Sequence, residues 1–424
     1  MTRALGLLLA SLPALAGCVA ALPIPVRVKR AERPVERGAP VTILVSIDGF
    51  RPDYLDRGVT PNLSRLAAEG ASGPMRPSFP SKTFPNHWTL VTGLVPDRHG
   101  IVANTFEDPA RPGETFTMAS DDPFWWNAAE PIWVAAERAG IRTATVFWPG
   151  SNVGWGGTRA RDWPHEVAGG TRPSSWQQYA EPVTEAQRVD AVVDLLRRPA
   201  ATRPRLLTLY FEAVDTAGHR FGPDARETTA AVAETDRSVG RLVAELAGLG
   251  QPANLVIVSD HGMAATSGAR AVALDRLVTP ADARIMEAGP YASLVPAPGR
   301  EAAVGRALLR PHPHMECWRK DRVPARFRYG ANPRVPPYLC LAEVGWSTVK
   351  TATDKVPAGN HGYDNAAPEM LALFVAHGPA FRPGARLPPF DNVDVYPLLR
   401  ELVGLPPVQG LDGTAAPFES ARRR

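Results

Sequence analysis

The sequence predicts an α/β fold, a three-layer sandwich in which helices cover both faces of a largely parallel central sheet. Two observations predict it. Short apolar runs such as Val41–Ile47 alternate along the chain with longer amphipathic stretches such as 225–249. This alternation is typical of parallel sheets, whose strands are joined by crossover helices. The runs are also apolar throughout, which indicates strands that are buried on both faces.

The composition fits a large globular chain. It has 424 residues, of which 44% are hydrophobic and 21% charged, enough for one elaborated domain or for two. The 44 prolines are about twice the average share and indicate long ordered loops. The net charge of +4 is small, and the arginines are scattered, so the sequence lacks the clustered basic footprint of a nucleic-acid-binding protein.

The N-terminus predicts export. Arg3 precedes an apolar stretch, residues 4–16, that is too short to span a bilayer and is typical of a signal peptide. Leu-Ala-Gly-Cys at 15–18 resembles the lipobox at which bacterial lipoproteins are cut and acylated. We therefore expect a signal peptide with lipobox over 1–18 and a periplasmic or cell-envelope protein that is lipid-anchored at Cys18. Cleavage by ordinary signal peptidase, which would give a soluble exported form, is the alternative.

The elements follow in order after a tether. Residues 19–40, rich in Pro, Arg and Glu without periodicity, are expected to be flexible. The catalytic domain is expected over 41–424. Its first strand is Val41–Ile47, and Thr60 and Pro61 begin a short helix that ends at Gly70. Further helices are expected around 131–139, 184–198 and 225–249, and further strands at 142–147, 205–211, 254–259 and 369–376.

Two regions interrupt the alternation. Residues 105–180 are crowded with Trp, Gly and Pro and are expected to form long loops that wall a pocket. Residues 280–355 hold short mixed elements together with Cys317 and Cys340, and are expected to form an inserted subdomain. In an oxidising compartment this even pair favours a disulfide, closing a loop of about 24 residues and worth roughly 3 kcal/mol. Two unrelated buried thiols are the alternative.

The stretch 81–93 predicts a helix with a reactive start. Polar residues precede Pro85, which is placed where a helix would begin, and apolar residues follow. Thr83 therefore lies at the mouth of the helix, among free backbone N–H groups and at the positive end of the dipole. Such a position favours a phosphate. Taken alone, the stretch is better explained by an ordinary threonine N-cap.

Asp and His residues follow several predicted strands. Because the carboxyl ends of parallel strands meet at one edge of a sheet, we expect these side chains to converge there, with Thr83 beside them. Mixed carboxylate and imidazole ligands suit Zn²⁺ at a catalytic site. A single Asp at a strand end is more often a cap, so the joint pattern carries the prediction; His87, His99 and His377 are expected to be structural. The six residues are Asp48, Asp215, His219, Asp260, His261 and His361.

Five segments carry a resemblance to a known family: 81–87, 96–104, 215–219, 260–263 and 361–365. In this order they resemble the motifs of the nucleotide pyrophosphatase/phosphodiesterase family, within the alkaline phosphatase superfamily, and the chain is identified as a bacterial member. The resemblance runs from about residue 41 to 400. It implies two Zn²⁺ per chain, one held by Asp215, His219 and His361, and the other by Asp48, Asp260, His261 and the Thr83 hydroxyl.

The resemblance also implies a mechanism. Thr83 would be the nucleophile that forms a phospho-threonine diester, which water then hydrolyses. Asn104 would stabilise charge on the phosphoryl oxygen, together with the Thr83 N–H group. Phe84 and Tyr179 would stack on the nucleobase from opposite sides. The threonine nucleophile and the neutral amide of Asn104 match a singly charged diester. Arg76 and Arg98 are close to these residues in sequence, but no pattern places them at the site.

The expected substrates are nucleotides or dinucleotides, cleaved to release a nucleoside 5′-monophosphate. Alternatives are a phosphodiesterase of choline or glycerophospho head groups, or a phosphonate hydrolase of the same superfamily. From a different class, a non-catalytic binding lipoprotein would require that some ligands be lost, and all seven metal-ligand positions are filled. The sequence does not indicate an oligomeric state.

Overall fold

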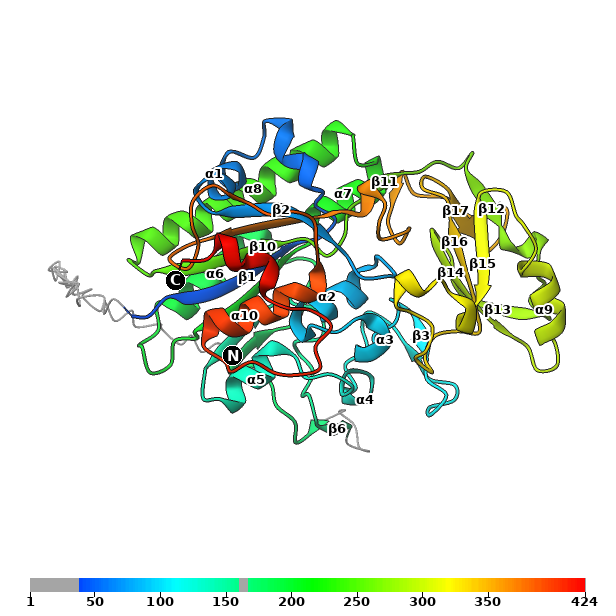
Figure 1. The fold of residues 1–424 in the computed structure, drawn as a ribbon, viewed down its shortest axis with the longest axis horizontal. Helices are drawn as coiled ribbons and strands as arrows, with labels where there is room; N and C mark the ends of the chain where they lie inside the picture. The colour runs from blue at the N-terminus through cyan, green and yellow to red at the C-terminus, as the bar shows by residue number, and fades with distance from the viewer. Residues whose placement is uncertain (1–37, 160–166, 424) are drawn as a thin grey trace, which may run out of the picture. The chain divides into compact units, whose positions relative to one another are not determined.

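The computed structural model describes residues 38–159 and 167–423 (Figure 1). In these residues the main sheet has nine strands in the order β20-β2-β19-β10-β1-β9-β5-β8, with β21 also beside β2. Strands β10, β1, β9, β5 and β8 run parallel to one another, whereas β19 is antiparallel to both β10 and β2. The prediction of a largely parallel sheet is therefore confirmed.

The predicted strands match observed strands to within a few residues, and β2, β8, β20 and β21 were not predicted. The segment 369–376 becomes a strand only at Ala372, because Pro368–Met370 forms a 3-10 turn first. The strands are β1 (Val41–Ile47), β2 (Ala71–Arg76), β5 (Thr143–Val146), β8 (Ser175–Gln177), β9 (Leu206–Phe211), β10 (Ala253–Val258), β19 (Ala372–His377), β20 (Ala385–Arg386) and β21 (Phe390–Asp391).

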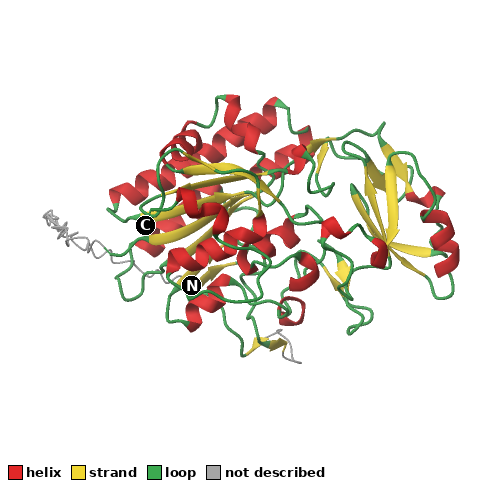
Figure 2. Cartoon of the chain, in the orientation of Figure 1, coloured by secondary structure: helices red, strands yellow, loops and turns green. Residues whose placement is uncertain are grey.

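Helices cover both faces of this sheet, as Figures 1 and 2 show. Alternate residues of β1 enter different cores: Ile43 and Val45 pack with one set of helices, and Leu44 packs with the other. This division confirms the three layers. The first set is α1 (Pro61–Glu69), α6 (Glu185–Leu196) and α8 (Arg226–Gly248); the second is α2 (Thr83–Thr92), α5 (Ile132–Arg138) and α10 (Val395–Val403).

Two helix starts show how the local sequence acts. At α6, the Thr184 hydroxyl accepts the Gln187 backbone N–H in a capping box. Helix α2 begins at Thr83, with Lys82 as its N-cap, so the predicted start at Pro85 was wrong by two residues. The first N–H groups of a helix lack intrahelical partners, and Pro85, as the third residue, therefore costs no helical hydrogen bond.

A second sheet lies within the segment 280–355. It is antiparallel, in the order β13 (Ala283–Glu287), β14 (Tyr291–Pro296), β16 (Tyr338–Ala342) and β15 (Met315–Arg319). Helix α9 (Glu301–Leu308) packs on it through Val304 and Leu308, which gives the sheet a core of its own. Cys317 and Cys340 face each other on β15 and β16 and form the disulfide, so this prediction is confirmed.

The remaining elements are short. The helices are α3 (Pro96–His99), α4 (Pro123–Trp126) and α7 (Ala213–Phe221). The two-stranded pairs are β3 (Phe106–Glu107) with β4 (Thr115–Phe116), β6 (Thr158–Arg159) with β7 (Val167–Ala168), β11 (Ala264–Ala265) with β18 (Gly359–Asn360), and β12 (Ala271–Ala273) with β17 (Ser347–Val349).

The predicted signal peptide, the lipobox with Cys18 and nearly all of the tether lie outside the described residues. Among the helices that the structure does describe, none combines the length and the apolar character that crossing a bilayer requires.

Candidate active site and metal centre

Three strand ends bring the acidic residues of the site together. Strand β1 lies between β9 and β10 and runs parallel to both, so the three strands end at the same edge of the sheet. Asp48 follows β1 at this edge, and the segments that carry Asp215 and Asp260 begin there. Gly49 has φ +68°, and a Cβ atom there would lie 3.0 Å from the Asp215 Cα. Glycine therefore permits both the left-handed backbone and the close approach of α7 to β1.

The first donor group is almost completely buried. The Nε2 atom of His261 lies 3.0 Å from Asp260 Oδ2 and 3.5 Å from Asp48 Oδ1. One donor atom from each residue lies within 4.8 Å of the others. The hydroxyl of Thr83, at the start of α2, is 3.3 Å from the same nitrogen of His261. The structure thus brings together the four side chains that the sequence grouped as one site.

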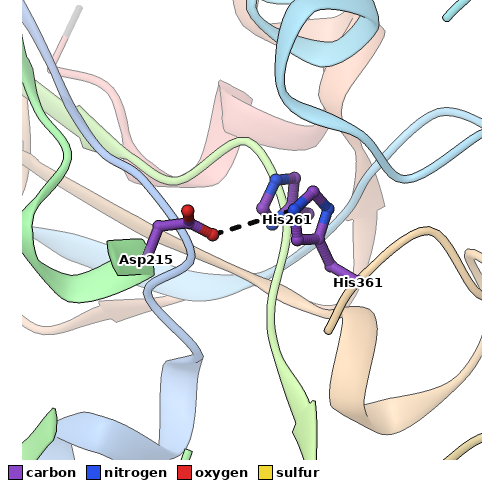
Figure 3. A group of neighbouring side chains, drawn as sticks. All are labelled: Asp215, His261 and His361. Carbon is purple, nitrogen blue, oxygen red and sulfur yellow. Dashed lines mark ion pairs between the residues drawn. The ribbon is translucent and has the colours of Figure 1, made fainter. Parts of the chain in front are cut away.

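The second donor group contains Asp215, His261 and His361, whose donor atoms also lie within 4.8 Å of one another (Figure 3). His361 Nε2 is 3.8 Å from Asp215 Oδ1, and the His261 and His361 rings stack with centroids 3.5 Å apart. His219, one helical turn after Asp215, places its Nε2 3.5 Å from Asp215 Oδ2. The two predicted ligand sets are adjacent, and His261 lies between them.

Backbone carbonyls orient the three imidazoles. The Nδ1–H group of His219 donates to the Gly359 carbonyl, that of His261 to the Gly262 carbonyl and that of His361 to the Ser81 carbonyl, each at 2.9 Å. A histidine held in this way presents the lone pair of Nε2 to its surroundings. All three Nε2 atoms face the carboxylates, which is the orientation that metal-binding histidines need.

The carboxylates lack the positive partners that burial demands. Asp48 Oδ1, Asp215 Oδ1 and Asp260 Oδ2 are buried and have no hydrogen-bond donor among the described residues. Burial, followed by the charges of Asp260 and Asp215, raises the pKa of Asp48 well above its usual value. Burial and the charge of Asp215 raise the pKa of Asp260 to about 8. Clustered buried anions with unpaired oxygens fit divalent cations.

Burial also favours the neutral form of the His361 imidazole. It lowers the pKa of His361, and the neighbouring His261 and His219 lower it further. Neutral imidazole is the form that binds a metal. Carboxylate oxygens and neutral nitrogens together are a donor set that suits zinc.

Two residues that support the ligands were missed from the sequence. The Tyr210 hydroxyl donates to Asp48 Oδ2 at 2.7 Å. His87 was expected to be structural, yet its Nδ1–H donates to the Thr83 carbonyl at 2.9 Å and lies 3.4 Å from Asp260 Oδ2. Its position four residues after Thr83, on the same face of the helix, was the available signal. Burial lowers the pKa of His87 to about 3, so the ring is neutral.

Asn104 is held next to the predicted nucleophile. Its Oδ1 accepts the Phe84 N–H group at 3.0 Å, which fixes the orientation of the amide. The NH₂ group has no partner among the described residues, and Asn104 and Thr83 line the same cavity. An amide placed in this way can donate to an oxygen of a bound phosphoryl group.

An aromatic cavity of about 570 Å³ opens over the acidic cluster. Phe84 and Tyr179 both line it; the Tyr179 ring is 46% exposed and lies edge-on to Phe147 at 5.8 Å. Much of the lining comes from the loops within 105–180, so their predicted role as pocket walls is confirmed. The apolar lining consists mainly of Phe84, Met118, Trp126, Phe147, Trp148 and Tyr179.

The nearby arginines are bound elsewhere. Arg76 pairs with Asp391 at 2.9 Å, and Arg98 pairs with Asp412 at 3.0 Å. Neither residue lines the cavity. The lining of the cavity near Thr83 therefore holds the neutral amide of Asn104 and no guanidinium.

A largely parallel sheet in this strand order, with acidic and imidazole side chains at the carboxyl ends of its strands, is the alkaline phosphatase-like fold. The family model described as type I phosphodiesterase / nucleotide pyrophosphatase matches residues 42–364. The chain belongs to the nucleotide pyrophosphatase/phosphodiesterase family. It is therefore a hydrolase, and the family to which it belongs is metal-dependent.

Several known proteins are similar over most of their length. A bis(5′-adenosyl)-triphosphatase of Xenopus laevis is 37% identical over 380 residues, which are 89% of this chain and 80% of the relative. Human ectonucleotide pyrophosphatase/phosphodiesterase 5 has a solved structure with a TM-score of 0.84 and 32% identity, covering 91% of this chain and all of that one. An inactive threonine-to-alanine variant of the murine protein, solved with AMP, has the same TM-score and identity.

Proposed function

We propose that this protein is a zinc-dependent nucleotide phosphodiesterase and pyrophosphatase that releases nucleoside 5′-monophosphates through a phospho-threonine intermediate. One observation carries the proposal: the Thr83 hydroxyl lies 3.3 Å from His261 Nε2, between the acidic cluster and the aromatic cavity. Two relatives support it by their names, one as a bis(5′-adenosyl)-triphosphatase and one through bound AMP.

Two zinc ions fit the donor groups. One would be held by Asp215, His219 and His361, and the other by Asp48, Asp260, His261 and Thr83. When bound, they would supply positive charge that stabilises ionised oxygens and the developing charge of the reaction.

The chain's own groups would then divide the work. Thr83 Oγ forms a bond to phosphorus, the bond from phosphorus to the leaving oxygen breaks, and that oxygen takes up a proton. Water then cleaves the phospho-threonine bond, which restores the hydroxyl and releases the monophosphate. Throughout, the Asn104 NH₂ and the Thr83 N–H donate to a non-bridging oxygen. Phe84 and Tyr179 would bind the base.

The charge around the cavity favours nucleotides over choline esters. A quaternary ammonium group needs aromatic rings together with a free acidic group. Glu212 lines the cavity near Tyr179 and Tyr210, but Arg188 binds both of its carboxylate oxygens. The cavity therefore has the rings without a free acidic charge from Glu212, and a nucleobase fits it better.

The function is tested by comparing two chromogenic esters. We expect kcat/KM for the nitrophenyl ester of thymidine 5′-monophosphate to exceed that for nitrophenyl phosphocholine by at least about tenfold, which corresponds to the 1–3 kcal/mol of one stacked base. Phe84→Ala should remove most of that advantage and leave bis(nitrophenyl) phosphate, which has no base, nearly unchanged. Initial rates at several substrate concentrations give these values.

Trp176→Ala is the control, because Trp176 is an exposed aromatic residue that does not line the cavity. It should leave the preference for the thymidine ester intact. Faster turnover of the phosphocholine ester would favour the head-group phosphodiesterase instead. Loss of both diesterase activities would favour a phosphonate hydrolase or a binding protein.

We also propose that the protein is an exported bacterial lipoprotein of the cell envelope. Residues 1–18 would direct export, Cys18 would carry the lipid, and residues 19–40 would tether the catalytic domain. Cys18→Ser should move the protein from the membrane fraction to the soluble fraction after cell lysis, because acylation needs the thiol. Membrane association of the variant would contradict the lipid anchor, and Cys317→Ser, in the disulfide, serves as the control for loss of a cysteine.

A further inference from the structure

We propose that Glu287, which comes from the second sheet, is a positioning residue that sets the spacing between Thr83 and Asn104. The inference rests on the proposed function, because it assigns Glu287 a part in placing the nucleophile and the amide of that reaction. Glu287 itself does not line the cavity.

Glu287 lies at the end of β13, where the pairing with β14 changes register between Ile285 and Glu287. Such irregularities in a strand often redirect a side chain next to an active site. The side chain is only 7% exposed. It points out of its own sheet and reaches the two segments that carry Thr83 and Asn104.

The two carboxylate oxygens bind different segments. Oε1 accepts the Thr105 backbone N–H at 2.6 Å, and Oε2 lies 3.3 Å from Lys82 Nζ. Thr105 directly follows Asn104, and Lys82 directly precedes Thr83. One buried carboxylate therefore contacts the neighbours of both groups that would act on the phosphoryl centre.

This contact closes a ring of interactions. On the far side, Phe84 N–H donates to Asn104 Oδ1 at 3.0 Å. The Lys82 carbonyl accepts the Asn86 backbone N–H at 3.1 Å and the Asn86 side-chain amide at 2.8 Å, which fixes the first turn of α2. Without Glu287, the Phe84–Asn104 hydrogen bond and the contacts of His99 with the Pro85 carbonyl and the Thr89 hydroxyl would still join the two segments, but Lys82 and Thr105 would lose their common partner.

The contact with Lys82 is an ion pair: Glu287 Oε2 lies 3.3 Å from Lys82 Nζ and makes no hydrogen bond among the described residues. Lys82 is 12% exposed, and Glu287 is its only carboxylate partner among the described residues. Its side chain also packs near Gly362, where an added Cβ would lie 3.4 Å from Lys82 Cε, directly beside His361. Removing one member of a buried pair leaves the other charge uncompensated, so Lys82 would have to move.

The same strand offers a matched control. Arg284, also on β13, binds the carboxylate of Glu107, which follows Thr105 by two residues. This pair also joins β13 to the segment that follows Asn104. Arg284 is 56% exposed, however, and makes no ion pair with a neighbour of Thr83. Its loss should weaken a surface contact and leave the nucleophile in place.

The test compares Glu287→Ala, Glu287→Gln and Arg284→Gln in the zinc-loaded full chain. With the nitrophenyl ester of thymidine 5′-monophosphate, we expect kcat of Glu287→Ala to fall about 10- to 100-fold with KM within about twofold, because small misplacements of reacting groups have effects of this size. Glu287→Gln keeps an acceptor for Thr105 and should fall less. Arg284→Gln should keep the kcat of the parent.

Two further measurements separate positioning from general stability. Hydrogen–deuterium exchange should become faster in peptides covering 82–86 and 103–106 for Glu287→Ala, and stay unchanged there for Arg284→Gln. As a single substitution, Lys82→Met should lower kcat. In the Glu287→Gln background the same substitution should lower kcat by a smaller factor, because the two residues act as one unit. If Glu287→Ala does not fold, Glu287→Gln and Lys82→Met carry the test.

Each result decides the question. Parent-like kcat in Glu287→Ala, an equal fall in Arg284→Gln, or full additivity of Lys82→Met with Glu287→Gln would overturn the proposal. Should the parent enzyme not cleave the ester at all, the proposed function fails. The exchange of 82–86 and 103–106 then still shows whether Glu287 holds the two segments, and unchanged exchange in Glu287→Ala would overturn that as well.

Discussion

Thr83→Ala is expected to lower kcat for nucleotide diesters by about 10³-fold or more, because the variant has no hydroxyl to form the phospho-threonine bond. The fold and the zinc content should stay near those of the parent, since the other six donor residues are unchanged. Thr83 is also the first residue of α2, where its side chain makes no capping hydrogen bond that alanine would lose. Steady-state kinetics, circular dichroism and metal analysis together check these outcomes.

Thr83→Ser is the matched control. It keeps a hydroxyl at the same place and removes only a methyl group, so it should retain a measurable part of the activity and should show a phosphorylated serine on rapid quenching. Parent-like turnover by Thr83→Ala would remove Thr83 from the mechanism. Equal loss of activity in both variants would indicate a packing defect at the start of α2 instead of a missing nucleophile.

The central strands could be predicted because their sequence carries the signal by itself. Strands β1, β9 and β10 are mainly apolar and almost completely buried, and each was expected at nearly its observed bounds. Strand β2 was missed because it contains Gly73 and Pro74, which interrupt a strand pattern. Its pairing with β19 and β21 is a tertiary contact that no local pattern in 71–76 indicates.

The acidic and imidazole residues of the site were also predictable, since strand ends and motif spacing mark them. Their supporting residues were not. Tyr210 lies within an apolar strand, and Glu287 belongs to the second sheet, far along the chain from Lys82. Both act through contacts that exist only once the chain is folded. The sequence likewise could not show that His261 would stand between the two donor groups.

Removal of zinc is expected to abolish activity and to destabilise the fold, and both effects should reverse when zinc is restored. At a free zinc concentration of about 100 times Kd, each site adds about 2.7 kcal/mol to the free energy of unfolding. For two sites in a chain of this size we expect Tm to rise by roughly 5 °C. Chelation followed by titration with Zn²⁺, with Tm and turnover measured at each step, tests this; activity without metal would contradict the site.

The zinc-induced rise in Tm should grow with pH between about 6.5 and 8. The pKa of Asp260 in the folded, metal-free protein is about 8, whereas an unfolded Asp titrates near 4. A raised folded pKa means that the folded state binds the proton more tightly, so metal-free stability falls as pH rises toward 8. His361, whose folded pKa is lowered, loses stability only below its unfolded value of about 6.5, outside this window.

The proposed zinc ions would reverse the slope, because they would bind the ionised carboxylates and their binding would improve as the protons leave. Asp260→Asn should flatten the metal-free curve, since the amide does not titrate, and should also reduce zinc binding. Asp321→Asn, at an exposed carboxylate that pairs with Arg319, should change neither. A metal-free Tm that rises from pH 6.5 to 8 would mean that the buried carboxylates are already compensated within the protein, and the cation centre would then lose its physical basis.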